Sequence, residues 1–269
     1  MVALPWSLRA RSLAKARRAF LRADPEGLHD FRVALRRAEA TAAALGEEKI
    51  ERRTRSLVRS LSPLRQLEID RGLLARLREL GLVGDNLSAG LEARWVAEYE
   101  GDLREAGRLA RSGRARRLER KLRRLARRRR GPGDSLLRLE IEWRRLERRL
   151  APPLENASDR RLHRYRITVK RARYLAEDLA ACGVSGLENR IEHEKELQDA
   201  LGRWNDILLF RERLEKTRDE SEKRGSVGLV LELDRLIGVL ETTVASARHH
   251  ALTVAGRFAR VLPFAEARA

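Results

Sequence analysis

Two short stretches of the sequence carry nearly the same row of cationic side chains. They are LHDFRVALRR at residues 28–37 and LHRYRITVKR at residues 162–171. A helix turns by roughly 100° per residue, so positions i, i+3 and i+7 lie along one side of it. These positions hold His29, Arg32 and Arg36 in the first stretch, and His163, Arg166 and Lys170 in the second. We interpret these two rows, called the two ladders, as groups that can donate hydrogen bonds to phosphate oxygens.

The apolar residues of the same stretches fall on the opposite helix face and predict where each helix packs. They are Phe31, Leu35, Ala38, Ala42 and Leu45 in the first, and Tyr165, Val169, Ala172, Ala176 and Leu179 in the second. Each ladder is therefore expected on the outer face of its helix. A charged outer face is most often only a solvated face, but such a face mixes acids with bases, and neither ladder contains an acid. Like charges one turn apart repel each other by about a few tenths of a kcal/mol, so the repetition of this pattern favours a bound polyanion.

The two leading histidines, His29 and His163, admit three chemical roles. Neither has a His, Cys or carboxylate neighbour at i+3 or i+4, and the adjacent arginines repel a cation, so a metal site is weakly supported. A general base is also weakly supported, because no nucleophile or orienting carboxylate is evident apart from Asp30. A donor of hydrogen bonds to phosphate fits best, since a nearby anion raises the pKa of a histidine. We interpret the remaining histidines as ordinary surface or core residues: His193, His249 and His250.

The composition predicts a helical protein with an anionic partner. The chain has 269 residues, of which 37% are charged and only 4% are aromatic. Its formal net charge of +19 predicts nucleic acid, an anionic membrane surface or a phosphate polymer as the partner. A single cysteine, Cys182, excludes a disulfide framework and fits a reducing compartment. Because the sequence shows neither a signal peptide nor an apolar stretch of roughly 20 residues, we expect a soluble cytoplasmic protein.

The landmarks of the sequence occur in the same order in its two halves. Besides the ladders, LSPLRQLEI at residues 61–69 aligns with LGRWNDILL at 201–209, Ser112 aligns with Ser246, and Trp6 with Trp143. Helical periodicity runs almost from end to end, and turn signals divide it into about ten helices. The signals are Asp24-Pro25-Glu26, Ser62-Pro63, residues 81–86, Gly113, residues 131–134, Pro152-Pro153, residues 182–186 and residues 225–228. We predict two helical repeats, residues 1–130 and 135–269, joined by a linker at 131–134 and packed about a pseudo-two-fold axis.

Residues 111–130, RSGRARRLERKLRRLARRRR, form a further basic feature that contains one acid, Glu119. Leu118, Leu122 and Leu125 mark an apolar stripe, so a helix is predicted rather than a disordered tail. The ordinary interpretation is a solvated helix end, and the functional one is the floor or rim of a groove for a polyanion. The aligned segment of the second half, SARHHALTVAGRFARVL, is far less charged, so dense charge is not needed in both halves.

The doubled motif resembles that of a known family. The pattern H-x-x-R-[VI]-x-x-[RK]-R, each time followed by a segment like L-x-x-x-L-G-x-x-N-D, is similar to the CHAD domain, the conserved histidine α-helical domain. The fuller match is the second half, with His163, Arg166, Lys170, Arg171, Arg173, Tyr174, Leu197-Gln198, Leu201-Gly202 and Asn205-Asp206. In the first half Glu39 stands where the second has Arg173, and Arg65-Gln66 stands where the second has Asn205-Asp206. The resemblance covers essentially the whole chain.

This resemblance implies an all-α fold of two four-helix bundles with internal two-fold symmetry and a basic central groove or pore between them. It implies that inorganic polyphosphate binds in this groove without catalysis, so no enzyme activity, cofactor or metal is expected. The residues implied to face the ligand are His29, Arg32, Arg36, Arg37, Arg55, Arg65, His163, Arg166, Lys170, Arg171, Arg173 and Lys195. It also implies polyphosphate-metabolising enzymes or granule proteins as partners, and a location in the cytoplasm or at polyphosphate granules.

Three other functions stay open on the sequence. A non-specific nucleic-acid binder would use the charge of residues 111–130, but single strands call for stacking aromatics, and the four tryptophans have helical core spacings. A metal-assisted phosphohydrolase would need a carboxylate cluster to hold magnesium, and the ladders offer none. A structural role, packing polyphosphate granules or recruiting proteins to them, cannot be separated from simple binding by sequence.

Overall fold

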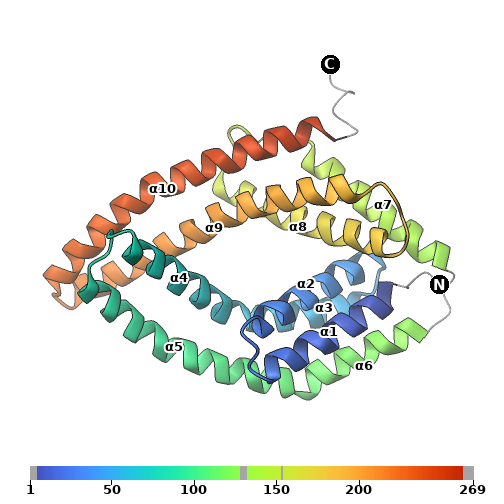
Figure 1. Ribbon diagram of the computed structural model, residues 1–269, viewed down its shortest axis with the longest axis horizontal. Helices are drawn as coiled ribbons and strands as arrows, with labels where there is room; N and C mark the ends of the chain where they lie inside the picture. The colour runs from blue at the N-terminus through green and yellow to red at the C-terminus, as the bar shows by residue number, and fades with distance from the viewer. Residues whose placement is uncertain (1–4, 128–131, 153, 263–269) are drawn as a thin grey trace.

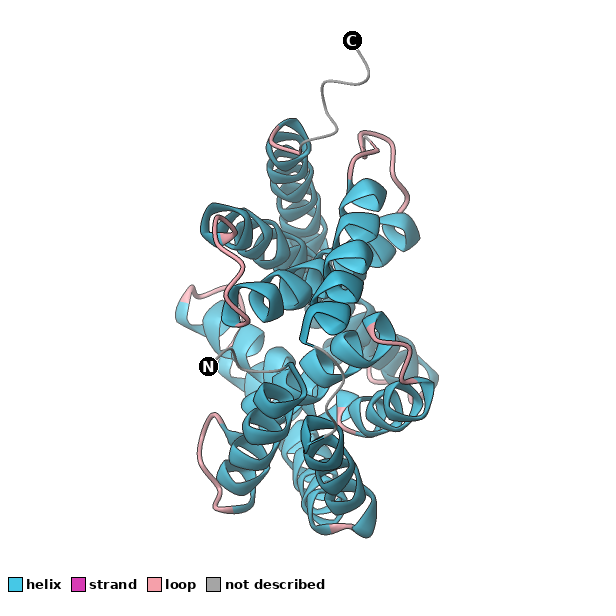
Figure 2. Ribbon diagram, turned by 90° about the vertical axis from the view of Figure 1, so that its right-hand side faces the viewer, coloured by secondary structure: helices cyan, strands magenta, loops and turns pink. Residues whose placement is uncertain are grey.

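The computed structural model of the chain describes residues 5–127, 132–152 and 154–262. Within these residues every regular element is an α-helix and no strand occurs, as predicted (Figure 2). The ten described helices are α1 (Pro5–Leu21), α2 (Gly27–Ala44), α3 (Glu48–Ser60), α4 (Ser62–Glu79), α5 (Asp85–Arg111), α6 (Gly113–Arg127), α7 (Pro132–Leu150), α8 (Asp159–Ala181), α9 (Glu188–Lys223) and α10 (Val227–Arg260). None of them contains a stretch long and apolar enough to cross a bilayer.

The helices form two arcs that face each other. Figure 1 shows α1–α6 along one arc and α7–α10 along the other, with the basic-ladder helices α2 and α8 on the inner side. The arcs meet where α2 packs against α8 and, toward the other end of the molecule, where α4 packs against α9. The two helices that carry the ladders are therefore direct neighbours, although they lie far apart in the sequence.

The two halves differ in the number of described helices. The first half has six described helices and the second has four, because α9 continues through Leu201-Gly202 whereas α3 and α4 are separated at the aligned Leu61-Ser62. Pro63 follows immediately, and a proline has no backbone N–H to continue a helix from the preceding turn. At the break between α5 and α6, the Ser112 hydroxyl accepts a hydrogen bond from the Ala115 backbone N–H, which caps α6. The two-fold relation between the halves stays a prediction.

Two predicted boundaries differ from the structure. The sequence predicts an N-cap at Asp24 with Pro25 and Glu26 in the first turn, whereas α2 begins at Gly27. A Cβ at Gly27 would lie 2.6 Å from the Cα of Phe20 on α1, so only glycine allows this close approach. The predicted linker 131–134 is helical from Pro132 onward, because a proline is tolerated at the first helical position, and Asp134 in the first turn favours the helix dipole. The rest of that linker, and residues 128–130 of the predicted basic helix, lie outside the described residues.

Both hydrophobic cores are built from both halves of the chain. The predicted apolar stripes are buried: Phe31, Leu35, Ala38, Ala42 and Leu45 on α2, and Tyr165, Val169, Ala172, Ala176 and Leu179 on α8. They belong to one large cluster that also includes residues of α1, α3 and α9. A smaller cluster joins Trp95 of α5 to Phe210 of α9, whose rings meet edge to face at 6.0 Å. The halves therefore share their cores, and the division at 131–134 stays a prediction.

A buried carboxylate ties the arcs together beside α2 and α8. Asp178 of α8 is fully buried, forms an ion pair with Arg9 of α1, and accepts a hydrogen bond of 2.6 Å from the hydroxyl of Thr41 on α2. Burial raises the pKa of Asp178, while Arg9 and Thr41 favour its charged form and oppose that rise. Folding thus depends on partners supplied from three helices.

Replacing Arg9 should destabilise the fold strongly. Arg9→Ala is expected to lower the free energy of unfolding by about 3–5 kcal/mol, because it leaves a buried carboxylate without its cation. The double variant Arg9→Met/Asp178→Asn should recover much of this loss, because it removes both charges. Urea denaturation measures all three proteins.

The control for this prediction is Arg52→Ala. Arg52 forms an exposed i,i+4 ion pair with Glu48 at 3.3 Å, and removing it should cost less than about 1 kcal/mol. Equal losses for Arg9→Ala and Arg52→Ala would mean that the buried ion pair contributes nothing special to the junction of the two arcs.

Candidate anion-binding site

The contact between α2 and α8 brings cations of both ladders together in the middle of the molecule. Arg32 and Arg36 on α2, Arg65 on α4, and Arg166 and Lys170 on α8 lie close enough for their charges to influence one another, and we call these five residues the central cluster. The expectation of an outward-facing ladder is wrong for Arg32, Arg166 and Lys170, which are partly buried. The reason is that α2 and α8 each contact helices on several sides, including helices of the other half.

Burial and repulsion between neighbouring cations lower the pKa values of three residues of the central cluster. Burial, with the nearby charges of Arg36 and Arg65, lowers the pKa of Arg32 to about 10. Burial, followed by the charge of Arg166, lowers the pKa of Lys170 to about 7, and Asp206 opposes this shift only partly. Burial also lowers the pKa of Arg166. Burial is the largest cause of all three shifts, and the neighbouring cations add to it.

Acids from other helices neutralise part of the cluster. Glu68 lies one turn after Arg65 on α4 and accepts from it at 3.2 Å. Asp206 of α9 faces Arg166 at 3.8 Å, a long ion pair. The Nε of Arg166 is buried and has no hydrogen-bond acceptor among the described residues. An anion entering the cluster could supply the acceptor that this guanidinium lacks.

The two histidines lie in different surroundings. The Nδ1 of His163 lies 2.9 Å from the Oδ1 of Asn205 on α9, so the ring is held in place at the start of α8. The His29 side chain is exposed at the start of α2 and forms no hydrogen bond with any described residue. The difference follows from the sequence, because the residue of the first half that aligns with Asn205 is the cation Arg65. Across the described residues, no group of three or more His, Cys, Asp or Glu side chains could hold a metal ion.

Arg37 and Arg173 hold α2 and α8 together. Both lie over the ring of Tyr174, with guanidinium carbons 5.6 and 5.0 Å from its centre. Both also form ion pairs with Glu177 of α8, at 2.7 and 2.5 Å. Arg173 further donates to Gln198 of α9 at 3.1 Å. These cations are engaged in protein contacts, although the Nε of Arg37, like that of Arg166, is buried without an acceptor among the described residues.

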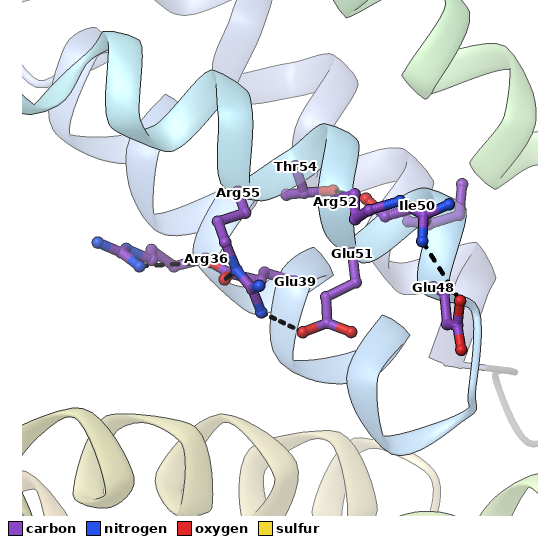
Figure 3. Close-up of polar contacts among 8 residues, drawn as sticks. All are labelled: Arg36, Glu39, Glu48, Ile50, Glu51, Arg52, Thr54 and Arg55. Carbon is purple, nitrogen blue, oxygen red and sulfur yellow. Dashed lines mark hydrogen bonds and ion pairs between the residues drawn. The ribbon is translucent and has the colours of Figure 1, made fainter. Parts of the chain in front are cut away.

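The remaining predicted ligand residues lie away from the centre or near its rim. Figure 3 shows Glu39 between α2 and α3, where it accepts from Arg36 at 3.3 Å and from Arg55 at 3.1 Å. Arg55 also pairs with Glu51 of its own helix. Lys195 of α9 is exposed and lies 3.9 Å from Glu192. Arg171 is half-buried and forms no hydrogen bond or ion pair with the described residues.

Comparison with known proteins places this geometry in a family. A family model described as the CHAD domain matches residues 7–215, more than half of the chain. The chain belongs to the CHAD domain family. The sequence-based identification is thereby confirmed, and the matched region includes the whole central cluster.

Solved structures agree with the CHAD fold. The chain is similar to the crystal structure of the CHAD domain from the plant Ricinus communis, with a TM-score of 0.74 and 19% identity over 97% of this chain and 91% of that one. It is also similar to PptA from Streptomyces chartreusis, with a TM-score of 0.69 and 17% identity over 95% of this chain and 97% of that one. At these identities the likeness concerns the fold alone. No curated protein sequence matches the chain significantly.

Sequence reasoning on this CHAD domain missed the acids near the ladders. Glu68, which pairs with Arg65 on its own helix, and Asp206 adjoin the central cluster, and Glu177 joins Arg37 to Arg173. Asp206 was visible as part of the family motif, but its distance in sequence from Arg166 gave no sign of the pairing. Glu177 could have been found from its i+4 spacing to Arg173, a common arrangement for helical ion pairs.

Lys170 gives this site a measurable pH signature. Between its folded pKa of about 7 and the ordinary value of 10.5, the unfolded chain binds more protons at this residue than the folded chain does. The stability of the wild type relative to Lys170→Met should therefore rise with pH in this window, by at most about 1.4 kcal/mol per pH unit. Urea denaturation of both proteins at several pH values measures this difference.

Lys195→Met is the matched control, because the Lys195 side chain is 55% exposed. Its stability should follow that of the wild type across the same pH range. Parallel curves for the wild type and Lys170→Met would show instead that Lys170 titrates as an ordinary surface lysine.

Proposed function

We propose that this CHAD domain binds inorganic polyphosphate at the central cluster and carries out no covalent chemistry on it. The observation that carries the proposal is the convergence of basic side chains from both halves at one place, where the pKa of Lys170 falls to about 7 and that of Arg32 to about 10. Such crowding of like charges is unfavourable without a counter-anion. A chain of phosphates supplies negative charge and acceptor oxygens at every step.

The exposure of the cluster supports access by a ligand. The side chains of Arg36 and Arg65 are 46% and 35% exposed, whereas that of Arg166 is 15% exposed. A phosphate chain would first meet the two exposed guanidinium groups and then approach Arg166 and Lys170 below them. The arrival of an anion would raise the pKa of Lys170 and restore its positive charge.

The surroundings of Tyr174, an aromatic residue beside the central cluster, favour polyphosphate over single-stranded nucleic acid as the ligand. Proteins that bind single strands without sequence preference stack bases on aromatic side chains. Tyr174 is 6% exposed, and its ring is covered by Arg37 and Arg173. It therefore offers no free face on which a base could stack. Polyphosphate has no bases and needs none.

A non-catalytic role also fits the acids near the cluster. Glu68 accepts from Arg65, and Asp206 faces Arg166, so each carboxylate already balances a cation of the protein. We expect binding of this kind to bring the chain to polyphosphate granules and to the enzymes that make or degrade the polymer.

Removing two exposed cations of the cluster should weaken polyphosphate binding specifically. Arg36→Ala/Arg65→Ala should raise the dissociation constant at least tenfold, because each charged hydrogen bond contributes roughly 1.5–3 kcal/mol. It should also reduce the slope of log affinity against log salt by about two, one for each phosphate that the variant no longer neutralises. Calorimetric titration with long-chain polyphosphate at several salt concentrations measures both quantities.

Arg52→Ala/Arg104→Ala is a charge-matched control. These side chains are 64% and 68% exposed and form ion pairs within their own helices. The control should retain affinity within about threefold, since screened surface charges contribute little. Equal weakening in both variants would indicate diffuse attraction, and displacement of polyphosphate by an equal charge of DNA would favour nucleic acid as the ligand. Release of orthophosphate on addition of magnesium or manganese would contradict the non-catalytic role.

Glu39 should act as an internal competitor of the ligand. It accepts from Arg36 and Arg55, and it stands where the second half has Arg173 (Figure 3). Glu39→Gln removes one negative charge and frees Arg36, so it should tighten polyphosphate binding by roughly three- to tenfold at low salt. Glu48→Gln, which removes an exposed acid paired with Arg52, is the control. Tightening by both variants to the same extent would show that only net charge matters.

A further inference from the structure

A second concentration of positive charge lies between α1 and α6, on residues that are not part of the central cluster. These helices pack side by side, as Figure 1 shows, and the ion pair of Arg17 on α1 with Glu119 on α6 at 3.0 Å helps to join them. A groove of about 630 Å³ runs between them, and we call it the outer groove. This volume lies within the range of about 300–1,000 Å³ typical of ligand sites.

The walls of the outer groove are basic. Arg11, Lys15 and Arg18 line it from α1, and Arg123 and Arg127 line it from α6. The three cations of α1 stand at i, i+4 and i+7, so they form a row along one side of the helix, as the cations of the ladders do. No carboxylate lines the groove.

The cations of this groove differ from ordinary surface arginines of the same protein. Exposed arginines elsewhere commonly pair with an acid one turn away, as Arg138 does with Asp134 and Arg144 with Glu140. Of the groove cations, only Arg123 has an ion pair with a described residue, Glu119 at 2.6 Å. A concave surface with charge of one sign and low-dielectric walls concentrates electrostatic potential and attracts counter-ions.

The uncharged residues that line the groove restrict the class of ligand that it can bind. Ala10 and Ala14, which are 4% and 3% exposed, are among the lining residues and add neither charge nor an aromatic ring. Ser7 and Ser12 also line the groove, and a serine hydroxyl can hydrogen-bond a phosphate oxygen. With no aromatic among its lining residues, the groove has nothing on which a nucleic-acid base could stack.

We propose that the outer groove is a second binding site for linear phosphate chains, independent of the central cluster. The ligand class is that of the proposed function, but the two sites share no residue, so either can exist without the other. The rows on α1 and α6 would grip the chain from both sides, with Arg11, Lys15, Arg18 and Arg127 as the cations that form no ion pair with a described acid. Arg123, Ala126 and Arg127, which belong to the described part of the basic segment, would thus supply one wall of the groove.

The test uses tripolyphosphate as the probe and compares charge-matched variants. Arg11→Ala/Lys15→Ala/Arg127→Ala removes three exposed groove cations, and Arg114→Ala/Arg117→Ala/Arg124→Ala removes three exposed cations of α6 that do not line the groove. Methyl-labelled alanine NMR follows the Ala10, Ala14 and Ala126 signals during titration at about physiological salt. Titration of the wild type should shift these signals, the α6 control should respond within threefold, and the groove variant should need at least tenfold more probe.

The outcomes separate this proposal from the proposed function. If Arg36→Ala/Arg65→Ala loses affinity for long polyphosphate while the alanine shifts persist, both sites are supported. If that variant binds normally and the shifts persist, the central site fails and the outer groove stands. Unshifted alanine signals in the wild type, equal weakening in the groove variant and its control, or displacement of the probe by a single-stranded oligonucleotide of equal charge would overturn the outer groove as a phosphate-chain site.

Discussion

Electrostatic repulsion between the two ladders is the constraint on which the arrangement of this molecule depends. Packing α2 against α8 buries apolar stripes that the sequence repeats, but it also brings Arg32 close to Lys170. The contact is tolerated because acids face several of the cations, and because Asp178 and Glu177 of α8 tie this helix to α2 through Thr41 and Arg37. The apolar packing and the ion pairs therefore act on one junction, and the excess charge is left where a ligand can reach it.

The two halves meet this constraint differently. In the second half, Asn205 of α9 contacts His163 of α8, and Asp206 of α9 faces Arg166 of α8. Two consecutive residues of α9 thus contact two ladder residues that are three positions apart. In the first half the aligned position holds Arg65 of α4, which adds to the repulsion, and the carbonyl of Leu61 accepts from Arg32 instead. Arg36 and Arg65 of the first half each pair with an acid one turn away on their own helix, whereas Arg166 of the second half faces an acid of another helix.

Much of this arrangement could be predicted from sequence, because it depends on local periodicity. The apolar stripes, the common side of His29, Arg32 and Arg36, and the turn at Ser62-Pro63 all follow from spacing within one or two helical turns. The direction in which the ladders face could not be predicted, since it depends on α2 meeting α8. Asp206 was missed for the same reason, because its partner lies on another helix and pairing across a fold leaves no periodic signal. Glu68 pairs with Arg65 one turn away on α4, but its closeness to Arg32 of α2 depends on the packing of the two helices.

The net charge of +19 is a poor guide to where an anion would bind. Many exposed arginines are balanced within their own helix, as Arg144 is by Glu140, and such pairs hold little affinity for a further anion. Charge that stays unbalanced is concentrated at the central cluster, where burial lowers the pKa of Lys170, and in the outer groove, where Lys15 has no acid beside it among the lining residues. The central cluster is crowded, and its charge depends on pH, whereas the outer groove is open, and its attraction for anions is screened by salt. A long phosphate chain could be held by both, and their different dependence on pH and ionic strength would then distinguish which of them dominates under given conditions.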